Sequence, residues 1–397
     1  MPKALIQVAL GLWGITPGNY SGITPVQDNV YAIVDDKDAV DGFQYLTLDF
    51  DLKTGKLLQA TLQEPEMMQL RRQAGEGFAR DPEGICFHPG RQTLFISGEA
   101  DQAILEYNLQ GKPTGASLAV PPSAAIDKIA SNYGFEALSY NEAQHLFWSV
   151  TEGPLLADGS ALPTAAPQGS TPLSLYASQQ SPSPKIDKKK QLDLVNEDRI
   201  EIKIPAAKQP AEAKHAEADS LAHEEPIKEN LLRLLSFDED LRFSKSFVYQ
   251  MDTKKSLGRK GNGVHGVSSI LALDNGQLIV MEREGFCPRW RLGAYVNIKL
   301  YLVNISEATP IPLDADIRRI PQDLICRKQL LAEFKTKFTL FRRNLANYEG
   351  MCLGPELSDG TPTLLLIADS QKGQGNFLFR LKDYLGILKI DKSTTAL

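Results

Sequence analysis

The chain has 397 residues, a formal net charge of −6 and four cysteines. Nucleic-acid binding requires a strongly basic face, so this charge argues against a nucleic-acid partner. No apolar run reaches the roughly 18 residues of a membrane span, and a chain of this size buries about 75% of its unfolded surface, so it needs no disulfide framework.

The chain opens with an apolar run, "ALIQVALGLWGI" at 4–15, which predicts a first strand. Five copies of one pattern follow. Each copy has a β-rich run, a turn and a second β-rich run that finishes on a carboxylate, as expected of a β-hairpin. The copies are "YSGITPVQDNVYAIVDD", "PEGICFHPGRQTLFISGEA", "FEALSYNEAQHLFWSVTEG", "VSSILALDNGQLIVMERE" and "YEGMCLGPELSDGTPTLLLIADS".

A further strand pair is expected after each hairpin, at 44–62, 103–120, 231–250, 298–313 and 376–390. Four strands per repeat are typical of propeller blades. The sequence therefore predicts an all-β chain that forms a β-propeller of five or six four-stranded blades in one domain, 1–397. A sixth blade could lie in 305–345 or be completed by the N-terminal strand.

One long low-complexity insertion, 158–226, interrupts the third blade. It is rich in Pro, Ala, Ser and Lys, as in "ASQQSPSPKIDKKK". Segments of this composition bury little apolar surface, so we expect a surface excursion that contributes little to the core. Residues 192–204 alternate well enough to form a hairpin inside it.

Acidic residues recur at two places in the repeat. Near the start of the first strand stand Glu83, Glu136 and Glu349, with Ser21 and Ser268 in the other two copies. The second strands finish on Asp35, Glu99, Glu152, Glu282 and Asp369. Because successive blades repeat around one axis, both sets are predicted to converge at one rim of the central channel.

The chain resembles a known family in "NVYAIVDD", "DPEGICFHP", "YGFEALSYN", "FWSVTEGPLLADG", "NGVHGVSSILALDNGQLIVMERE" and "NYEGMCLGPELSDGTPTLLLIADS". These stretches look like the successive motifs of the esterase-like-activity-of-phytase family of propeller-type proteins. The resemblance implies phosphoesterase or esterase activity carried by the recurring acids. Many relatives look exported, so it also implies a periplasmic or secreted protein, although a cytoplasmic location stays open. The last copy departs from the family pattern with "ADSQKGQGN".

Converging carboxylates repel one another unless pKa shifts, hydrogen bonds or a bound cation compensate. All-oxygen ligands suit a divalent cation, and the flexible shell favours Ca²⁺. We expect the second set, Asp35, Glu99, Glu152, Glu282 and Asp369, to hold the metal. Catalytic candidates are Glu83, Glu136, Glu349 and His265, and Arg283, Lys37 and Lys372 are candidates for binding an anionic small-molecule substrate.

Other interpretations stay open. The acids could be structural, the protein could be a calcium-dependent lactone or carboxyl-ester hydrolase, or it could be a non-catalytic binding module. No Gly-x-Ser-x-Gly elbow of a serine esterase occurs in the sequence. Whether Cys287 and Cys326 pair is left open as well. A monomer without a membrane span is expected.

Overall fold

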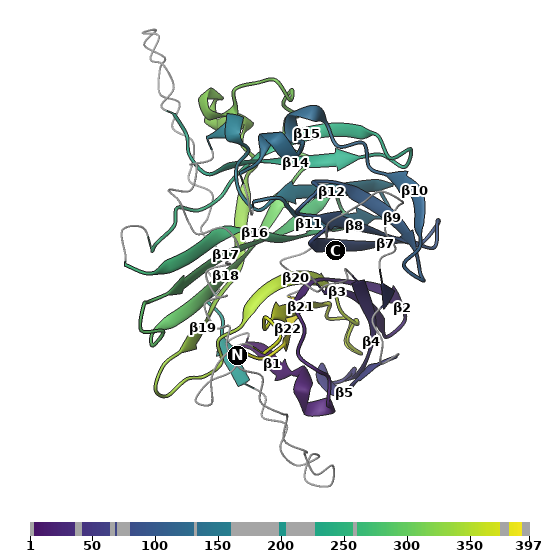
Figure 1. The fold of residues 1–397 in the computed structure, drawn as a ribbon, viewed down its shortest axis with the longest axis vertical. Helices are drawn as coiled ribbons and strands as arrows, with labels where there is room; N and C mark the ends of the chain where they lie inside the picture. The colour runs from purple at the N-terminus through teal and green to yellow at the C-terminus, as the bar shows by residue number, and fades with distance from the viewer. Residues whose placement is uncertain are drawn as a thin grey trace.

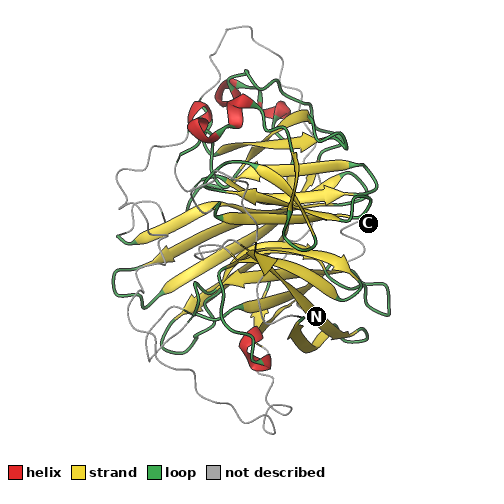
Figure 2. Cartoon of the chain, turned by 45° about the vertical axis from the view of Figure 1, so that its right-hand side comes forward, coloured by secondary structure: helices red, strands yellow, loops and turns green. Residues whose placement is uncertain are grey.

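Five antiparallel sheets surround one axis in the computed structural model, which describes residues 4–35, 42–63, 68–69, 80–130, 133–159, 198–203, 227–256, 260–373 and 381–390 (Figure 1). Strands fill the body of the molecule, and short helical turns lie at its margins (Figure 2). The predicted all-β propeller is confirmed, and the number of blades is five.

The first three blades follow the predicted order of strands. Blade 1 consists of β2 (Tyr20–Gln27), β3 (Val30–Asp35), β4 (Gly42–Asp51) and β5 (Lys56–Leu62), with β6 (Met68–Gln69) beside β4. Blade 2 consists of β7 (Pro82–His88), β8 (Thr93–Gly98), β9 (Ile104–Asn108) and β10 (Pro113–Ser117). Blade 3 consists of β11 (Phe135–Asn141), β12 (Leu146–Thr151), β14 (Leu231–Phe237) and β15 (Phe243–Gln250).

The last two blades differ from the prediction in their outer strands. Blade 4 consists of β16 (Asn262–Ala272), β17 (Gln277–Cys287), β18 (Ala294–Asn304) and β19 (Lys328–Phe338). Its fourth strand therefore lies at 328–338 and not within 298–313. Blade 5 consists of β20 (Asn347–Leu353), β21 (Thr363–Asp369), β22 (Tyr384–Lys389), β1 (Ala4–Ala9) and β13 (Asp198–Glu201).

The N-terminal strand closes the ring. β1 pairs with β22, with Ile6 opposite Ile387, so the two ends of the chain complete one blade. Both outer strands of this blade were predicted within 376–390, which is wrong for the fourth strand, because that strand is β1. Residues 376–380 lie outside the described residues. The segment 305–327 forms no sixth blade, because Ile311, Ile317 and Ile325 pack on Leu231 and Val248 of blade 3.

Short 3-10 helices lie in the connections between strands. They are η1 (Leu10–Trp13), η2 (Pro122–Ala124), η3 (Ile126–Lys128), η4 (Leu156–Asp158), η6 (Ile317–Arg319) and η7 (Gln322–Leu324). None of the described helices is long and apolar enough to cross a membrane.

Five apolar clusters hold the blades together, one between each pair of neighbours. In the interface of blades 2 and 3, for example, Phe95 packs on Phe147 with ring centroids 4.6 Å apart. The other clusters join blades 1 and 2, 3 and 4, 4 and 5, and 5 and 1. Since alternate residues of a strand face opposite neighbours, the period-2 pattern of the sequence fills both interfaces.

The described parts of the 158–226 insertion contribute to the structure, which differs from the expectation. The insertion lies between β12 and β14. Asp158 is buried and pairs with Arg233, and Ile200 and Ile202 belong to the core between blades 4 and 5. Of the hairpin predicted at 192–204, the described residues show one strand, β13, which pairs with β1 and not with a second strand of the insertion.

Candidate functional site

A β-bulge or register irregularity occurs in the innermost strand of every blade, near the strand's start in blades 1, 2, 3 and 5 and in the middle of the longer strand of blade 4. The pairing registers shift between Tyr20 and Gly22, Pro82 and Ile85, Phe135 and Ala137, Val267 and Ser269, and Tyr348 and Gly350. The residue left out of register in blades 1, 3, 4 and 5 is the recurring one of the sequence, Ser21, Glu136, Ser268 or Glu349, and in blade 2 the irregularity contains the recurring Glu83 together with Gly84. We call this the ring position. A bulge changes the direction in which the bulged residue's side chain points. The same backbone feature therefore orients the side chain at the ring position in each blade.

Small residues beside the ring position let the inner strands approach closely. A Cβ added to Gly22 would lie 2.5 Å from the backbone oxygen of Glu83, and one added to Gly84 would lie 2.9 Å from the backbone oxygen of Glu136. Contacts this short are not tolerated between real Cβ atoms and backbone. The inner strands of successive blades therefore meet around the axis, and the ring positions lie near one another.

The carboxylates at the ends of the second strands do not all occupy one position. The residue before the bulge pairs with Asp35 in blade 1 and with Glu282 in blade 4. In blades 2, 3 and 5 the corresponding partners are Gly98, Thr151 and Ala368. Glu99, Glu152 and Asp369 come one residue later, at the position that Arg283 holds in blade 4. We call this the exit position.

A shift of one residue turns a side chain to the other face of the sheet. Met281 and Ile279 lie in the core with blade 5, whereas Val280 and Leu278 lie in the core with blade 3. Glu282 and Arg283 accordingly point to different interfaces. The predicted set of five equivalent carboxylates is thus wrong for Asp35 and Glu282, and an arginine completes the exit positions.

Arg283 is the centre of an ion-pair cluster that joins three blades. Its Nη2 lies 2.7 Å from Oε1 of Glu152 and 3.5 Å from Oε2 of Glu136, and its Nη1 donates to Oε1 of Glu349. Nη1 also lies 3.3 Å from Oδ1 of Asn347, whose Nδ2 donates to Glu349. Arg283 was predicted to bind substrate, but its guanidinium is occupied by three glutamates.

The exit side chains fit because the next blade leaves room for them. Glu99 accepts a hydrogen bond from the backbone of Gly134, and a Cβ on Gly134 would lie 2.7 Å from Cγ of Glu99. A Cβ on Gly266 would lie 2.2 Å from Cγ of Glu152. Each exit residue of blades 2, 3 and 4 thus lies against the residue two before the ring position of the following blade, and in blade 5 that residue is Asn347.

Burial and charge set the protonation of Glu136. Burial raises its pKa well above the ordinary value, and Glu152 and, more weakly, Glu99 and Glu349 add to the shift, while Arg283 opposes it. Glu349 is in a different environment, because its side chain is 12% exposed and bonded to Arg283 and Asn347. The pKa of Arg283 is raised well above its usual value: burial opposes the charge, but Glu349, Glu136 and Glu152 outweigh it.

A second acidic group adjoins this cluster. Ligand oxygens of Asp81, Glu83 and Glu99 lie within 4.8 Å of one another. Glu99 also raises the pKa of Glu136, so the two acidic groups adjoin at the rim where the second strands end, which we call the channel mouth. Among the described residues this is the group of carboxylates close enough to share a metal ion. Asp81 was missed by the sequence analysis, although it opens the recurring "DPEG" stretch.

The other predicted ligands and catalytic groups lie apart. Glu282 accepts hydrogen bonds from Tyr249 (2.6 Å) and from Lys328 (2.6 Å) in the interface of blades 3 and 4. His265 is near Glu282 and Glu284, and burial lowers its pKa. Both residues belong to a polar network that includes Asp252, bound by Lys328 at 2.9 Å. In this network Lys328 pairs with both Asp252 and Glu282.

The remaining predicted residues lie in the interface of blades 5 and 1. Asp35 accepts a hydrogen bond from the backbone of Asn19, and Asp369 from that of Gln371. The backbone of Lys372 donates to Gly18. Asp383, which the sequence did not indicate, accepts from the backbones of Gly18 and Ser370, and burial raises its pKa to about 7. Lys37 lies outside the described residues.

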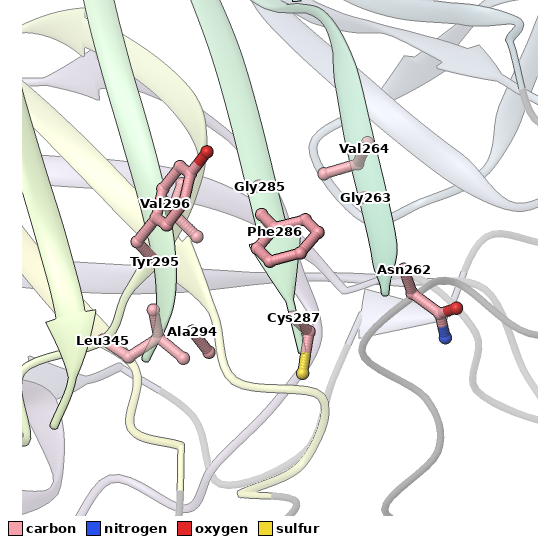
Figure 3. A pocket seen from close by; sticks show the side chains of 10 residues that line it. All are labelled: Asn262, Gly263, Val264, Gly285, Phe286, Cys287, Ala294, Tyr295, Val296 and Leu345. Carbon is pink, nitrogen blue, oxygen red and sulfur yellow. The ribbon is translucent and has the colours of Figure 1, made fainter. Parts of the chain in front are cut away.

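An apolar pocket lies away from the acids, at the outer end of the long strands of blade 4. It is lined by Val264, Phe286, Tyr295, Val296 and Leu345, among others, with Cys287 at its edge (Figure 3). Cys287 and Cys326 are both free, so they do not pair. The pocket holds no carboxylate, and we assign it no part in the chemistry of the channel.

Comparisons with known structures show only distant likeness. An endo-arabinase from Bacteroides thetaiotaomicron matches with a TM-score of 0.41 at 8% identity, covering 97% of both chains. An α-L-arabinofuranosidase from Lactobacillus brevis gives 0.41 at 10% identity over 96% of this chain and 92% of that one. A periplasmic gluconolactonase from Pseudomonas aeruginosa gives 0.36 at 11% over 98% and 100%. These scores are too low to carry an argument about function.

A search of curated proteins found no match. The sequence does match a family model, "Phytase-like: Esterase-like activity of phytase", over residues 15–187 and 206–371. The ring and exit positions described above all lie within these two matched ranges. The chain therefore belongs to this phytase-like family, a family of hydrolase-type propellers.

Proposed function

We propose that the protein hydrolyses a small anionic phosphate ester or phosphodiester at the channel mouth, with the help of a divalent cation. The observation that carries this proposal is the meeting of two unlike acidic groups. Asp81, Glu83 and Glu99 bring three ligand oxygens within 4.8 Å of one another, beside Glu136, whose burial favours the protonated form.

The donor set fits a hard cation. All three groups are carboxylates, and oxygen ligands suit Ca²⁺ better than softer metals. Oδ1 of Asp81 is buried and has no hydrogen-bond partner, which is costly unless a ligand satisfies it. When bound, such a cation would neutralise charge, polarise a phosphoryl oxygen and acidify a bound water. The donor set therefore supports Asp81, Glu83 and Glu99 as the ligands of the cation. Glu152 is paired with Arg283 instead.

Glu136 and Glu349 support complementary roles in proton transfer. Two carboxylates in unlike environments, one of which favours its protonated form, are the arrangement found in acid–base pairs. Glu136, whose burial favours the protonated form, would donate a proton to the leaving oxygen. Glu349, which is partly exposed, would accept a proton from water, while Arg283 and Asn347 hold its carboxylate in place.

The excess of negative charge at the channel mouth distinguishes hydrolysis of an anionic phosphate ester from hydrolysis of a neutral ester. Among the described residues Arg283 is the cation that contacts ring glutamates, and it is already paired with two of them, Glu136 and Glu349, and with Glu152. An anionic ester would be repelled from this surface unless a bound cation compensated the charge. A neutral lactone or carboxyl ester would need no such compensation. A calcium-dependent lactone or carboxyl-ester hydrolase is therefore the second candidate.

A substrate panel with and without chelator tests the proposal. Phosphomonoesters, phosphodiesters, lactones and acyl esters would be offered to metal-stripped protein with Ca²⁺, Mg²⁺ or Mn²⁺ restored. We expect hydrolysis of a phosphate ester that chelation abolishes and that Glu136→Gln and Glu349→Gln reduce about 100-fold or more. Glu356→Gln, an exposed change at the opposite rim of blade 5, is the matched control.

The ligand assignment has its own readout. Ca²⁺ at about 100 times its dissociation constant should stabilise the native state by roughly 2.7 kcal/mol. Glu99→Gln should lose most of this stabilisation, whereas Glu282→Gln should keep it. Activity only on neutral esters would favour the alternative, and no activity on any substrate would favour a binding module. The likeness to exported relatives also supports an extracytoplasmic location, which cell fractionation would test.

A further inference from the structure

Two neighbouring turns at the tip of blade 4 carry fully exposed aromatic side chains. Residues 288–293 join β17 to β18, and residues 339–343 follow β19. Trp290 is 88% exposed in the first turn, and Phe341 is 95% exposed in the second. Leu292 and Leu340 beside them are 47% and 71% exposed. We call these four side chains and their turns the blade 4 tip.

Backbone hydrogen bonds fix the two turns side by side. The amide of Gly293 donates to the carbonyl of Phe338 at 2.8 Å, so the turn after β17 is bound to the end of β19. The first turn is closed by Arg291 N to Pro288 O at 2.8 Å, and Phe338 forms a bridge with Arg343 in the second. The aromatic side chains are therefore presented by short, hydrogen-bonded turns.

The charged residues of the two segments that form the tip are all basic, in a chain whose net charge is −6. The segments 285–298 and 334–348 contain no acidic residue. Their basic residues are Arg289, Arg291, Lys335, Lys337, Arg342 and Arg343. Within the part of the chain that the structure describes, neither Arg289 nor Arg342 forms an ion pair. This positive charge is thus available to an anionic partner.

We propose that the blade 4 tip binds the surface of a membrane that contains anionic lipid. Exposed Trp and Phe are costly in water and favourable at the boundary between headgroups and acyl chains. Arginines beside them would meet anionic headgroups, each contributing attraction that salt weakens. A specific protein partner commonly buries about 800 Å² on each side, whereas two narrow turns suit insertion into a deformable surface.

Such binding would also orient the propeller. β17 runs from Arg283 outward to Cys287 at the tip, a span of about 13 Å at the rise of a strand. Inner strands begin, and second strands end, at this same rim, so the blade 4 tip lies on the side of the acidic channel mouth. A docked protein would turn that mouth toward the lipid. The proposal does not depend on catalysis in the channel.

Sedimentation of the full chain with vesicles tests the proposal. The probes are vesicles of phosphatidylcholine alone and of phosphatidylcholine with phosphatidylglycerol added. We expect binding that requires phosphatidylglycerol, weakens with salt and shifts Trp290 fluorescence to shorter wavelength. Arg289→Glu with Arg342→Glu should weaken binding at least about fivefold per arginine, and Trp290→Ser with Phe341→Ser should weaken it by about tenfold or more.

Matched changes at other exposed sites provide the control. Leu58→Ser, Ile126→Ser and Arg242→Glu alter exposed residues far from the tip in sequence and should bind like the wild type. The proposal is overturned if neither vesicle binds, if neutral and anionic vesicles bind equally, or if the tip variants bind as well as the controls. A dimer that the tip variants dissociate, with no vesicle binding, would assign the tip to self-association instead.

Discussion

Arg283 Nη2 and Glu152 Oε1 lie 2.7 Å apart although the two residues belong to different blades. Both occupy the exit position of their own blade, and both side chains are buried. They meet because Gly266, directly opposite Arg283 in the pairing of β16 with β17, has no side chain to separate them. The contact therefore depends on two residues at the exit position of successive blades and on the absence of a Cβ at Gly266.

Replacing Arg283 with Met should lower the free energy of unfolding at neutral pH by about 3–5 kcal/mol, because buried carboxylates lose their cation. Glu136 would then gain a proton more readily in the folded state, because Arg283 is the group that lowers its pKa. The deficit should consequently shrink as the pH falls toward 5. Denaturant unfolding at several pH values measures the difference in unfolding free energy between variant and wild type. Arg242→Met at the surface is the control. An equal deficit at all pH values would contradict the electrostatic explanation.

Gly266→Ala should destabilise the fold by about 1–3 kcal/mol, because a Cβ there would lie 2.2 Å from Cγ and 2.7 Å from the backbone oxygen of Glu152. Gly11→Ala is the matched control, since nothing lies within 4 Å of a Cβ at that site. The two changes are compared by thermal unfolding. Equal melting temperatures would show that blades 3 and 4 separate easily at this point.

The repeat made the fold predictable, but the pairing register of its acidic residues could not be predicted. Each hairpin copy keeps its own alternation of apolar residues, so the blades and their order follow from the sequence. Glu282 and Glu152 both look like the last acid of a strand, yet bulges set their registers one residue apart. A one-residue shift leaves the local pattern almost unchanged while it exchanges the two faces of the sheet.

Closure of the ring could not be read from local patterns either. β1 and β22 pair across nearly the whole chain, and β19 lies more than twenty residues after the strand that it joins. Asp81 and Asn347, in contrast, had a usable signal. Both stand two residues before a ring glutamate, in "DPEG" and "NYEG", where the other copies have Asn19, Gly134 and Gly266. Comparing the residues at this position across the five copies would have indicated that they contact the preceding blade.

Two deletions separate the parts of the insertion. Removing 158–226 should destabilise the protein, because it removes Asp158, which pairs with Arg233 at 2.7 Å, and β13, which extends blade 5. Losing one partner of a buried pair costs about 3–5 kcal/mol. Removing 161–190 alone spares both features and should change the melting temperature little. Calorimetry of both variants measures this, and equal losses would contradict a structural role confined to Asp158 and β13.

Asp383 should make the stability of the protein fall as the pH rises from about 4 to about 7. Burial raises the pKa of its carboxyl to about 7, above the ordinary value near 3.8. In this window the folded state therefore holds a proton that the unfolded chain has released. Stability falls with rising pH wherever the native state binds more protons, so Asp383 alone accounts for a loss of up to about 4 kcal/mol.

Asp383→Asn removes the titrating group, so the difference in unfolding free energy between variant and wild type should move in favour of the variant as the pH rises. The comparison is made by denaturant unfolding at fixed ionic strength, because other carboxylates add their own slopes to both proteins. The backbone amides of Gly18 and Ser370 lose part of their acceptor in the variant, but that cost does not vary with pH. Asp240→Asn, at an exposed site, should show no such trend. A difference that stays constant between pH 4 and 8 would mean that Asp383 is ionised in the folded protein throughout, stabilised by those two amides against the burial that otherwise favours its proton.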